Sequence, residues 1–409
     1  MLKLLPLPCL FILFSCSKSS TTDPVPLPVP VDSATVTVTG GYGSAKYKVG
    51  DTVHIFCAAF TSTQQFSTWV SADASLLNAP NEWHTWFIMP ARNVSFAGSL
   101  SSITAVTLNY EQIRGRDRLK PVYSIFPAGH KGIVYLLHGT GGTALNLVNN
   151  YELIQLYKTL VTDGYAIIVT EAEEATTGID VDGDGKLRWA YAPLDTLTNV
   201  DYVNIRNITD TFYNRGVTSR SKPRYSVGMS NGGHFSSTLS YIYNFKAGVS
   251  YCAPMGSPLA LASTIPFQFC MARWDNHPDV GQTGNANALS NSNTLSGRGI
   301  CSKYFIHQRS PLYPERFARR GDITLAKSAT VFAELKNKGY INSKNFYIGY
   351  SDALVTAFTA NPASFPELLS ITPLQRLFVV EQIDLAVADH QMYSDYNKAT
   401  LRFLNQQCL

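Results

Sequence analysis

The stretch that most constrains this chain is PRYSVGMSNGGHFSSTLSYIY at residues 223–243. A short apolar run at 225–227 leads into GMSNG at 228–232 and then into a segment with helical character. Gly-x-Ser-x-Gly between a strand and a helix is typical of a sharp turn that carries a nucleophilic serine. The turn strains the serine backbone, and glycines on either side let neighbouring main chain approach. The pattern predicts Ser230 as a nucleophile; the alternative is a Gly-rich turn around an ordinary serine.

A second glycine-rich turn lies upstream of the serine. The apolar run IVYLL at 133–137 is followed by HGTGGT at 138–143. A strand that ends in His-Gly and further glycines can turn backbone N–H groups toward a nucleophile. We expect the N–H groups of Thr140 and Asn231 to form an oxyanion hole, with Gly141 as the alternative to Thr140. We expect His138 to be a structural hydrogen-bonding group rather than a base.

The other members of a catalytic triad should follow the serine in the order acid, then histidine. Three histidines follow the serine helix, and His390 is favoured because it precedes a final amphipathic segment, whereas His307 lies in a loop-like region. The acid is expected just past the strand FQFCMA at 267–272. Asp275 is the first choice and Asp279 the second.

These motifs carry a family resemblance. LLHGTGG at 136–142, GMSNGG at 228–233 and ADH at 388–390 resemble the α/β-hydrolase superfamily. The Ser-Asn-Gly-Gly elbow is similar to the secreted polyhydroxybutyrate-depolymerase and feruloyl-esterase-like branch. The resemblance implies a serine esterase that hydrolyses carboxylic esters, of the plant-polysaccharide, feruloyl or polyester type, through an acyl-enzyme and without a required cofactor. A serine peptidase of the same superfamily and a non-catalytic surface-binding lipoprotein are the alternatives.

The fold class expected over residues 103–409 is α/β, with a mostly parallel, doubly wound sheet of α/β-hydrolase type. A Gly/Asn/Ser-rich stretch suggests an insertion at about 281–320. The expected strands are Thr104–Tyr110, Pro121–Phe126, Gly132–Leu137, Tyr165–Val169, Arg224–Val227, Ala247–Tyr251, Phe267–Ala272 and Arg376–Gln382. The expected helices are Asn146–Thr162, Val203–Arg215, Gly233–Tyr243 and Ile323–Lys338.

Residues 33–102 are expected to form a small, separate β-rich module, because apolar residues alternate with threonine between glycine-containing turns. GDTV at 50–53, FSTW at 66–69 and FIMP at 87–90 resemble divergent bacterial surface repeats, which space or bind. The core expected for the module comprises Val36, Val38, Val53, Ile55, Phe66, Trp69, Phe87, Met89 and Phe96.

The N-terminus predicts an exported protein. Residues 1–16 combine Lys3, an apolar run too short to span a bilayer, and LFSC ending at Cys16, which resembles a lipobox. A Ser- and Pro-rich linker follows at 17–32. We expect a lipid-anchored or secreted protein of the bacterial cell envelope, with contact to membrane only through the lipid; an ordinary secretory signal is the alternative. The net charge of +4, without a basic block, gives no reason to expect nucleic acid as a partner.

Five cysteines remain after the leader, and no CxxC pair occurs, which argues against a zinc or redox motif. Export permits disulfides, and we expect one pair among Cys252, Cys270 and Cys301. The odd number leaves at least one thiol free or paired between chains.

Two further features bear on ligands. Asp180, Asp182 and Asp184 alternate in DVDGDGK, as at the start of an EF-hand calcium loop. A structural calcium ion there, with an upstream glutamate in place of the missing final one, is weighed equally against a solvated turn. Trp189 and Trp274 are the candidates for contact with an ester substrate, which is expected to be linked to a polysaccharide or similar polymer.

Overall fold

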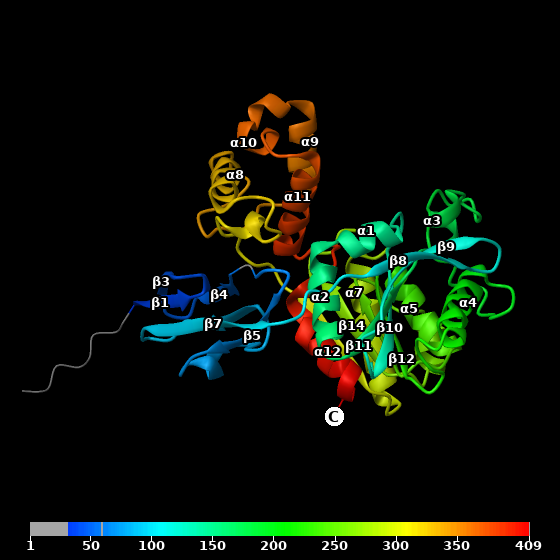
Figure 1. The fold of residues 1–409 in the computed structure, drawn as a ribbon. Coiled ribbons are helices and arrows are strands. Elements are labelled where there is room, and N and C mark those ends of the chain that lie inside the picture. The colour runs from blue at the N-terminus through cyan, green and yellow to red at the C-terminus, as the bar shows by residue number, and fades with distance from the viewer. Residues whose placement is uncertain (1–31, 59, 409) are drawn as a thin grey trace, which may run out of the picture.

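The computed structural model describes residues 32–58 and 60–408. The predicted leader at 1–16 and nearly all of the linker at 17–32 lie outside the described residues. Two small β-sheets, a large mixed sheet flanked by helices, and a separate group of helices follow one another along the described chain (Figure 1).

The large sheet has eight strands in the order β15-β14-β13-β12-β10-β11-β9-β8. The strands from β15 to β11 are parallel to their neighbours, whereas β9 runs antiparallel to both β11 and β8. Their bounds are β8 Asn109–Arg114, β9 Leu119–Ile125, β10 Gly132–Leu137, β11 Tyr165–Val169, β12 Arg224–Met229, β13 Ala247–Tyr251, β14 Phe267–Ala272 and β15 Ser302–His307. This mostly parallel sheet has the α/β-hydrolase fold.

Helices cover both faces of this sheet, as the unbroken apolar strand β10 requires. Val134 and Leu136 pack with helices α2 (Tyr151–Thr162) and α12 (Asn397–Gln406). Ile133, Tyr135 and Leu137 pack with α4 (Val200–Asn214) and α5 (Asn231–Ile242) on the other face. The helices around the sheet are α1 Ala144–Asn149, α2 Tyr151–Thr162, α3 Glu173–Thr177, α4 Val200–Asn214, α5 Asn231–Ile242, α6 Ser257–Ala262, α7 Gly281–Gly297 and α12 Asn397–Gln406.

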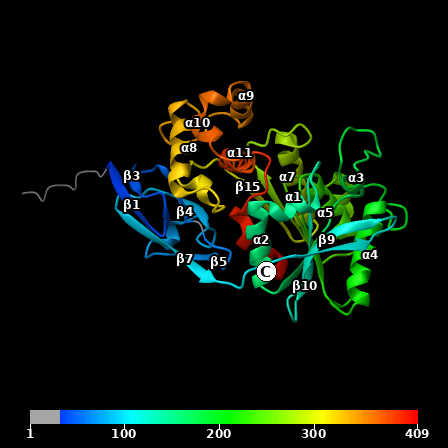
Figure 2. The same ribbon diagram turned by 45° about the horizontal axis from the view of Figure 1, so that its top comes forward.

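Between β15 and the C-terminal helix the chain forms a helical lobe, residues 308–387, with a core of its own. Figures 1 and 2 show this lobe bordering the small sheets on one side and α1 on the other. Its elements are η2 Arg316–Ala318, α8 Leu325–Asn337, α9 Asp352–Ala360, η3 Pro362–Ser364, α10 Pro366–Leu369 and α11 Pro373–Val387. A 3-10 turn, η4 Ser394–Tyr396, then leads into α12.

Two expectations for this region are wrong. The stretch 281–320 is not simply an insertion, because α7 packs on the sheet and β15 pairs with β14 along six residues. The expected strand Arg376–Gln382 lies inside α11, which begins with a capping box between Thr372 and Gln375 and has proline at its first turn. The expected strand Thr104–Tyr110 overlaps β8 by only two residues. The expected helix Asn146–Thr162 is two helices, α1 and α2, because Asn150 has an extended backbone and caps α2; the other expected strands and helices overlap observed elements.

The small sheets lie within residues 33–102. The order is β3-β1-β7-β5 in one sheet and β2-β4-β6 in the other. All nine residues expected in this core are buried in one cluster. The bounds are β1 Ser33–Thr39, β2 Gly41–Tyr42, β3 Ala45–Lys48, β4 Thr52–Cys57, β5 Gln64–Val70, η1 Ala74–Leu76, β6 His84–Ile88 and β7 Val94–Ser102.

The small sheets are packed firmly on the rest of the protein. Glu82 accepts hydrogen bonds from the backbone N–H groups of Lys398 and Ala399 at the start of α12, at 3.2 and 2.9 Å. The Arg319 guanidinium of the lobe lies 3.8 Å from the centroid of the Trp83 ring. Trp83 and Arg319 are both buried, so this contact is part of the interior.

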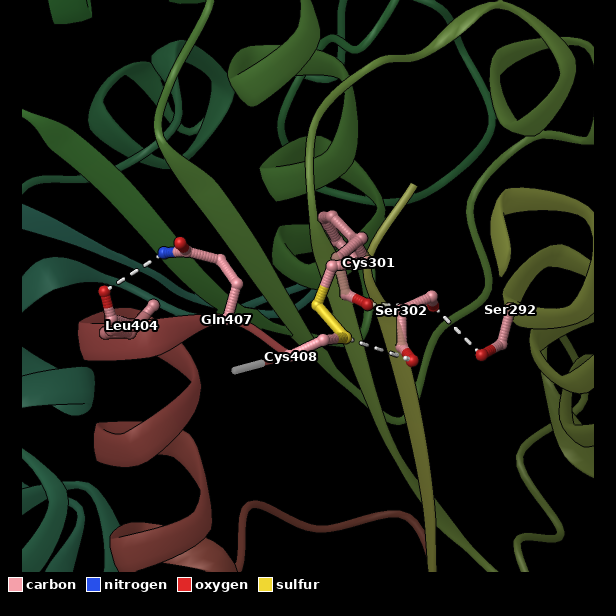
Figure 3. The surroundings of a disulfide bond; sticks show 7 residues. Ser292, Cys301, Ser302, Leu404, Gln407 and Cys408 are labelled. Carbon is pink, nitrogen blue, oxygen red and sulfur yellow. Dashed lines mark hydrogen bonds between the residues drawn. A yellow bond between two sulfur atoms is a disulfide. The ribbon is translucent and has the colours of Figure 1, made fainter. Parts of the chain in front are cut away.

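One disulfide occurs in the described residues, between Cys301 and Cys408 (Figure 3). It ties the start of β15 to the chain end just after α12, across 107 residues of sequence. The expected pair among Cys252, Cys270 and Cys301 is therefore wrong. Cys301 pairs with Cys408, and Cys252 and Cys270 are not bonded to each other. Cys57, Cys252 and Cys270 are free and buried. No helix in residues 32–58 and 60–408 is long and apolar enough to span a membrane.

Candidate active site

Ser230 stands on the turn between β12 and α5, in a backbone conformation that residues other than glycine rarely adopt, with φ of 56°. A Cβ atom on Gly228 would lie 2.0 Å from the Gly232 carbonyl oxygen. One on Gly232 would lie 2.3 Å from the His138 carbonyl oxygen. Only glycine fits either position, so the two glycines of the motif let the turn and the strand end β10 pack together.

The second glycine-rich turn lies against the serine. A Cβ atom on Gly139 would be 3.1 Å from Ser230 Cβ. The Gly141 N–H donates to the Leu187 carbonyl at 2.8 Å and is therefore not available to a ligand. Within the described chain the N–H groups of Thr140 and Asn231 have no hydrogen-bond acceptor. Of the two alternatives, the free amide is that of Thr140, the first choice from the sequence.

His138 has a structural environment. Its Nδ1 donates to the Gly139 carbonyl at 2.7 Å, and its Nε2 accepts from the Ala172 N–H at 3.0 Å. Burial lowers the pKa of His138 to about 4, so the ring is neutral at physiological pH. With both nitrogens engaged, His138 has no free atom with which to act as a base.

Asp275 and His390 meet although 115 residues separate them. The Asp275 Oδ2 accepts a hydrogen bond from His390 Nδ1 at 2.7 Å, and its Oδ1 accepts from the His277 N–H at 2.9 Å. Asp275 is buried, so the imidazole is held by a carboxylate sheltered from solvent. This is the contact by which an acid fixes the ring orientation of a catalytic histidine.

The loops that carry Asp275 and His390 are joined on either side of that pair. The Trp274 N–H donates to the Ala388 carbonyl at 2.9 Å, and the Asn276 N–H donates to Asp389 Oδ1 at 3.0 Å. Three consecutive residues of the acid loop therefore contact the histidine loop.

Asp279, the second choice for the acid, lies elsewhere. Its carboxylate pairs with the Lys186 ammonium, and its side chain is 46% exposed. The Lys186 charge lowers the pKa of Asp279, mainly through the hydrogen bond between the two side chains. Between the two carboxylates left open by the sequence, only Asp275 contacts His390.

The end of strand β13 contacts both Ser230 and the Asp275–His390 pair. The Ser230 N–H donates to the Tyr251 carbonyl at 2.8 Å. The sulfur of the next residue, Cys252, one carboxylate oxygen of Asp275 and one ring nitrogen of His390 all lie within 4.8 Å of one another. No hydrogen bond between Ser230 Oγ and His390 Nε2 is present in the described residues, where His390 Nε2 is buried without any partner.

A second histidine, which the sequence does not reveal, stacks on His390. The ring of His277 lies 4.4 Å from that of His390, centroid to centroid, at an interplanar angle of 24°. Burial lowers the pKa of His277, and so does the neighbouring His390 ring. A neutral His277 therefore covers one face of His390. Only its closeness to Asp275 in sequence could have suggested this contact.

The two tryptophans expected to contact substrate differ in position. Trp189 is only 1% exposed and stacks on Phe235, so it cannot contact substrate in this conformation, and the prediction for it is wrong. Trp274 is 45% exposed, beside Asp275, with the Arg309 guanidinium 4.8 Å from its ring centroid. It stays a candidate for substrate contact.

Trp189 instead joins the two halves of the expected oxyanion hole. Its indole N–H donates to the His138 carbonyl at 3.0 Å, and its backbone N–H donates to the side-chain oxygen of Asn231 at 2.8 Å. Two residues earlier, Leu187 holds the Gly141 N–H. Segment 187–189 thus contacts both the turn after β10 and the residue after Ser230. In the sequence, the only sign of this role is a tryptophan in an otherwise polar loop.

The Asp/Gly loop brings only part of the expected calcium-binding set together. Oxygens of Asp180, Asp182 and Glu174 lie within 4.8 Å of one another, which matches the expectation that an upstream glutamate takes part. The carboxylate of Asp184 is not part of this group and pairs with Arg188, as one oxygen of Asp182 also does at 3.3 Å. The Asp180 carboxylate accepts from the N–H groups of Gly183 and Gly185, at 2.8 and 2.6 Å. The calcium site stays a prediction.

A cavity of about 1060 Å³ opens beside the serine turn. The turn after β10, including Thr140, forms one side of it, together with Met229, which precedes Ser230. Gln391 and Met392, which follow His390, also line it. Direct sequence neighbours of both the candidate nucleophile and the candidate base therefore line a space that could hold a substrate.

No protein-family model and no curated protein matches this sequence. The chain is similar in structure to an esterase from Pyrococcus furiosus, at 11% identity and a TM-score of 0.36, over 49% of this chain and 82% of the other. It is similar to a ferulic acid esterase at 11% identity and a TM-score of 0.36, over 49% and 89% of the two chains. It is also similar to the dienelactone hydrolase of Anabaena variabilis at 15% identity and a TM-score of 0.37, over 56% and 97%.

Proposed function

We propose that this protein is a serine hydrolase that cleaves carboxylic esters. The observation that carries the proposal is the buried hydrogen bond between Asp275 and His390, at the same end of the sheet as the strained Ser230. The order serine, acid, histidine along the chain is that of this fold. The free N–H groups of Thr140 and Asn231 supply two donors for an oxyanion.

In the proposed reaction Ser230 Oγ attacks the ester carbonyl carbon and its proton passes to His390 Nε2. The carbonyl oxygen becomes an oxyanion that accepts hydrogen bonds from Thr140 and Asn231. As the carbon–oxygen bond to the alcohol breaks, His390 gives its proton to the leaving alkoxide. Water, deprotonated by His390, then hydrolyses the acyl-enzyme and restores Ser230. Asp275 keeps the ring oriented and stabilises the imidazolium.

Labelling with a fluorophosphonate probe tests this proposal. The wild-type protein should be labelled at Ser230, and Ser230→Ala should abolish the labelling. Ser257, the first residue of α6 on another helix of the same fold, offers a matched control, because Ser257→Ala should be labelled like the wild type. A folded wild-type protein that takes up no label would favour the alternative of a non-catalytic surface-binding lipoprotein.

The finer assignments rest on sequence resemblance. We propose an esterase of the feruloyl or polyester type rather than a peptidase, because the elbow SNGG resembles that branch. Matched ester and amide substrates with the same acyl group would separate the two, since only a peptidase should cleave the amide at an appreciable rate.

The location is proposed on the same basis. Residues 1–16 would direct export and Cys16 would carry a lipid, which leaves the hydrolase in the bacterial cell envelope. Residues 33–102 would be a relative of the divergent surface repeats. Incorporation of labelled palmitate, lost in Cys16→Ser, supports the anchor; an unlabelled, released protein supports an ordinary secretory signal.

A further inference from the structure

Two walls of the cavity beside the serine turn carry exposed leucines. One wall comes from α1 and the start of α2 and includes Leu145, which is 55% exposed, and Ile154. The other comes from α11 of the helical lobe and includes Leu374 and Leu377, which are 69% and 55% exposed. Exposed leucines gathered around one cavity are unusual on a protein surface and indicate a binding site for an apolar group.

The spacing along α11 makes this wall continuous. Residues 374, 377, 378 and 381 recur at intervals of three and four, so they lie on one face of the helix. At a rise of about 1.5 Å per residue, the face from Leu374 to Glu381 is roughly 10 Å long. From Glu381 the helix continues to Val387, close to His390. The apolar wall therefore leads away from the catalytic end of the cavity.

We propose that this cavity holds a long or bulky apolar group of the ester substrate, between Leu145 on one side and Leu374 and Leu377 on the other. This inference rests on the proposed esterase function and specifies its substrate class as esters with an extended apolar part rather than acetyl esters of small alcohols. The helical lobe, not the sheet, sets this preference.

Glu381 is the polar exception in the α11 wall. It lines the cavity, and within the described residues its carboxyl group makes no hydrogen bond or ion pair. Burial, together with the nearby Glu152 carboxylate, raises the pKa of Glu381 to about 7. A carboxyl group here must lose water when an apolar group enters, which opposes binding.

Two series of substrates test the proposal at a fixed pH of 8. Acetyl, butyryl and octanoyl esters of p-nitrophenol vary the acyl group, and methyl, butyl and octyl acetate vary the alcohol. In at least one of the two series kcat/KM should rise with chain length, by up to about 4-fold for each added methylene group, which is the gain expected from burying one methylene. If kcat/KM is flat or falls with chain length in both series, the proposal is wrong.

Variants locate the effect. Leu374→Asp should lower kcat/KM for the longest substrate about 10-fold more than for the shortest, whereas Glu381→Leu should raise kcat/KM for the longest. Leu369 is a matched control, because it is an exposed leucine of the same lobe outside the cavity lining, and Leu369→Asp should change neither. Equal effects of the two aspartate variants would overturn the proposal.

Failure of this inference is distinct from failure of the esterase function. If Ser230 is labelled by the fluorophosphonate and acetyl esters are cleaved without a preference for chain length, only the substrate class is wrong. If Ser230 is not labelled and no ester is cleaved, the function itself is wrong.

Discussion

His84 of the small sheets donates a hydrogen bond from Nδ1 to Asp395 Oδ1 at 2.5 Å, and both side chains are buried. Asp395 follows His390 by five residues, so a strand of the N-terminal sheets holds the segment that carries the candidate base. On its other side His84 Nε2 contacts His54 Nδ1 at 3.0 Å. The small sheets are therefore part of the support of the active site as well as an N-terminal module.

Replacing His84 should destabilise the whole protein. His84→Ala leaves the Asp395 carboxylate buried without its hydrogen-bond donor, which typically costs about 3–5 kcal/mol. The free energy of unfolding from urea denaturation should fall by about this amount, and Asp395→Asn in the same chain should restore part of it. A loss below about 1 kcal/mol would mean that the Asp395 carboxylate finds another partner.

Asp275 and Asp279 should differ sharply when each is changed to asparagine. Asp275→Asn places an amide where the imidazole needs a carboxylate and should lower kcat by about 10⁴-fold. Asp279→Asn breaks only an exposed pair with Lys186 and should leave kcat within about 2-fold. Steady-state kinetics on one ester substrate decides, and the reverse ranking would assign the acid to Asp279.

Trp189 should affect turnover more than substrate binding. Trp189→Phe keeps a ring against Phe235 but removes the indole N–H that holds the His138 carbonyl. We expect kcat to fall by about 10-fold with KM nearly unchanged, because the Thr140 amide is less well positioned for the oxyanion. Trp86→Phe, in strand β6, is the control and should leave kcat unchanged. A rise in KM alone would instead indicate substrate contact.

Glu82 should make stability depend on pH. Burial raises the pKa of Glu82 to about 8, from 4.5. Between about pH 4.5 and 8 the folded protein keeps this proton while the unfolded chain loses it, so the stabilising contribution present at low pH declines as pH rises. Glu82→Gln stays neutral at every pH.

The melting temperatures of wild type and Glu82→Gln test this. The variant should gain relative to the wild type as the pH rises from 5 to 8, and a difference that is constant with pH would contradict the raised pKa.

Removing the Cys301–Cys408 disulfide should also destabilise the fold. Changing both cysteines to serine releases a cross-link across 107 residues and should lower the free energy of unfolding by about 2–4 kcal/mol. Cys57→Ser, at a free and buried cysteine, is the control for the loss of a thiol. Equal transitions for the double variant and the wild type, under oxidising conditions, would show that the bond does not form.

The sequence alone determined those features of the protein whose physical cause lies in a short stretch of the chain. The elbow requires glycine at 228 and 232, because any Cβ there meets backbone. The strand β10 is apolar throughout because both its faces are covered. In strand β1 of the small sheets the buried residues Val36 and Val38 follow from alternation, since side chains of a strand point to opposite faces in turn.

The tertiary structure decided what depends on distant contacts. Helix α7 is rich in Gly, Asn and Ser and resembles a loop in composition, yet its Asn285 donates to the Ala272 carbonyl of β14 and the helix packs on the sheet. The run LFVV in α11 favours a strand locally, but the capping box and the lobe core make it a helix. Likewise, only the packing of three remote segments distinguishes Asp275 from Asp279 and buries Trp189, because hydrogen bonds over such distances leave no local pattern in the sequence.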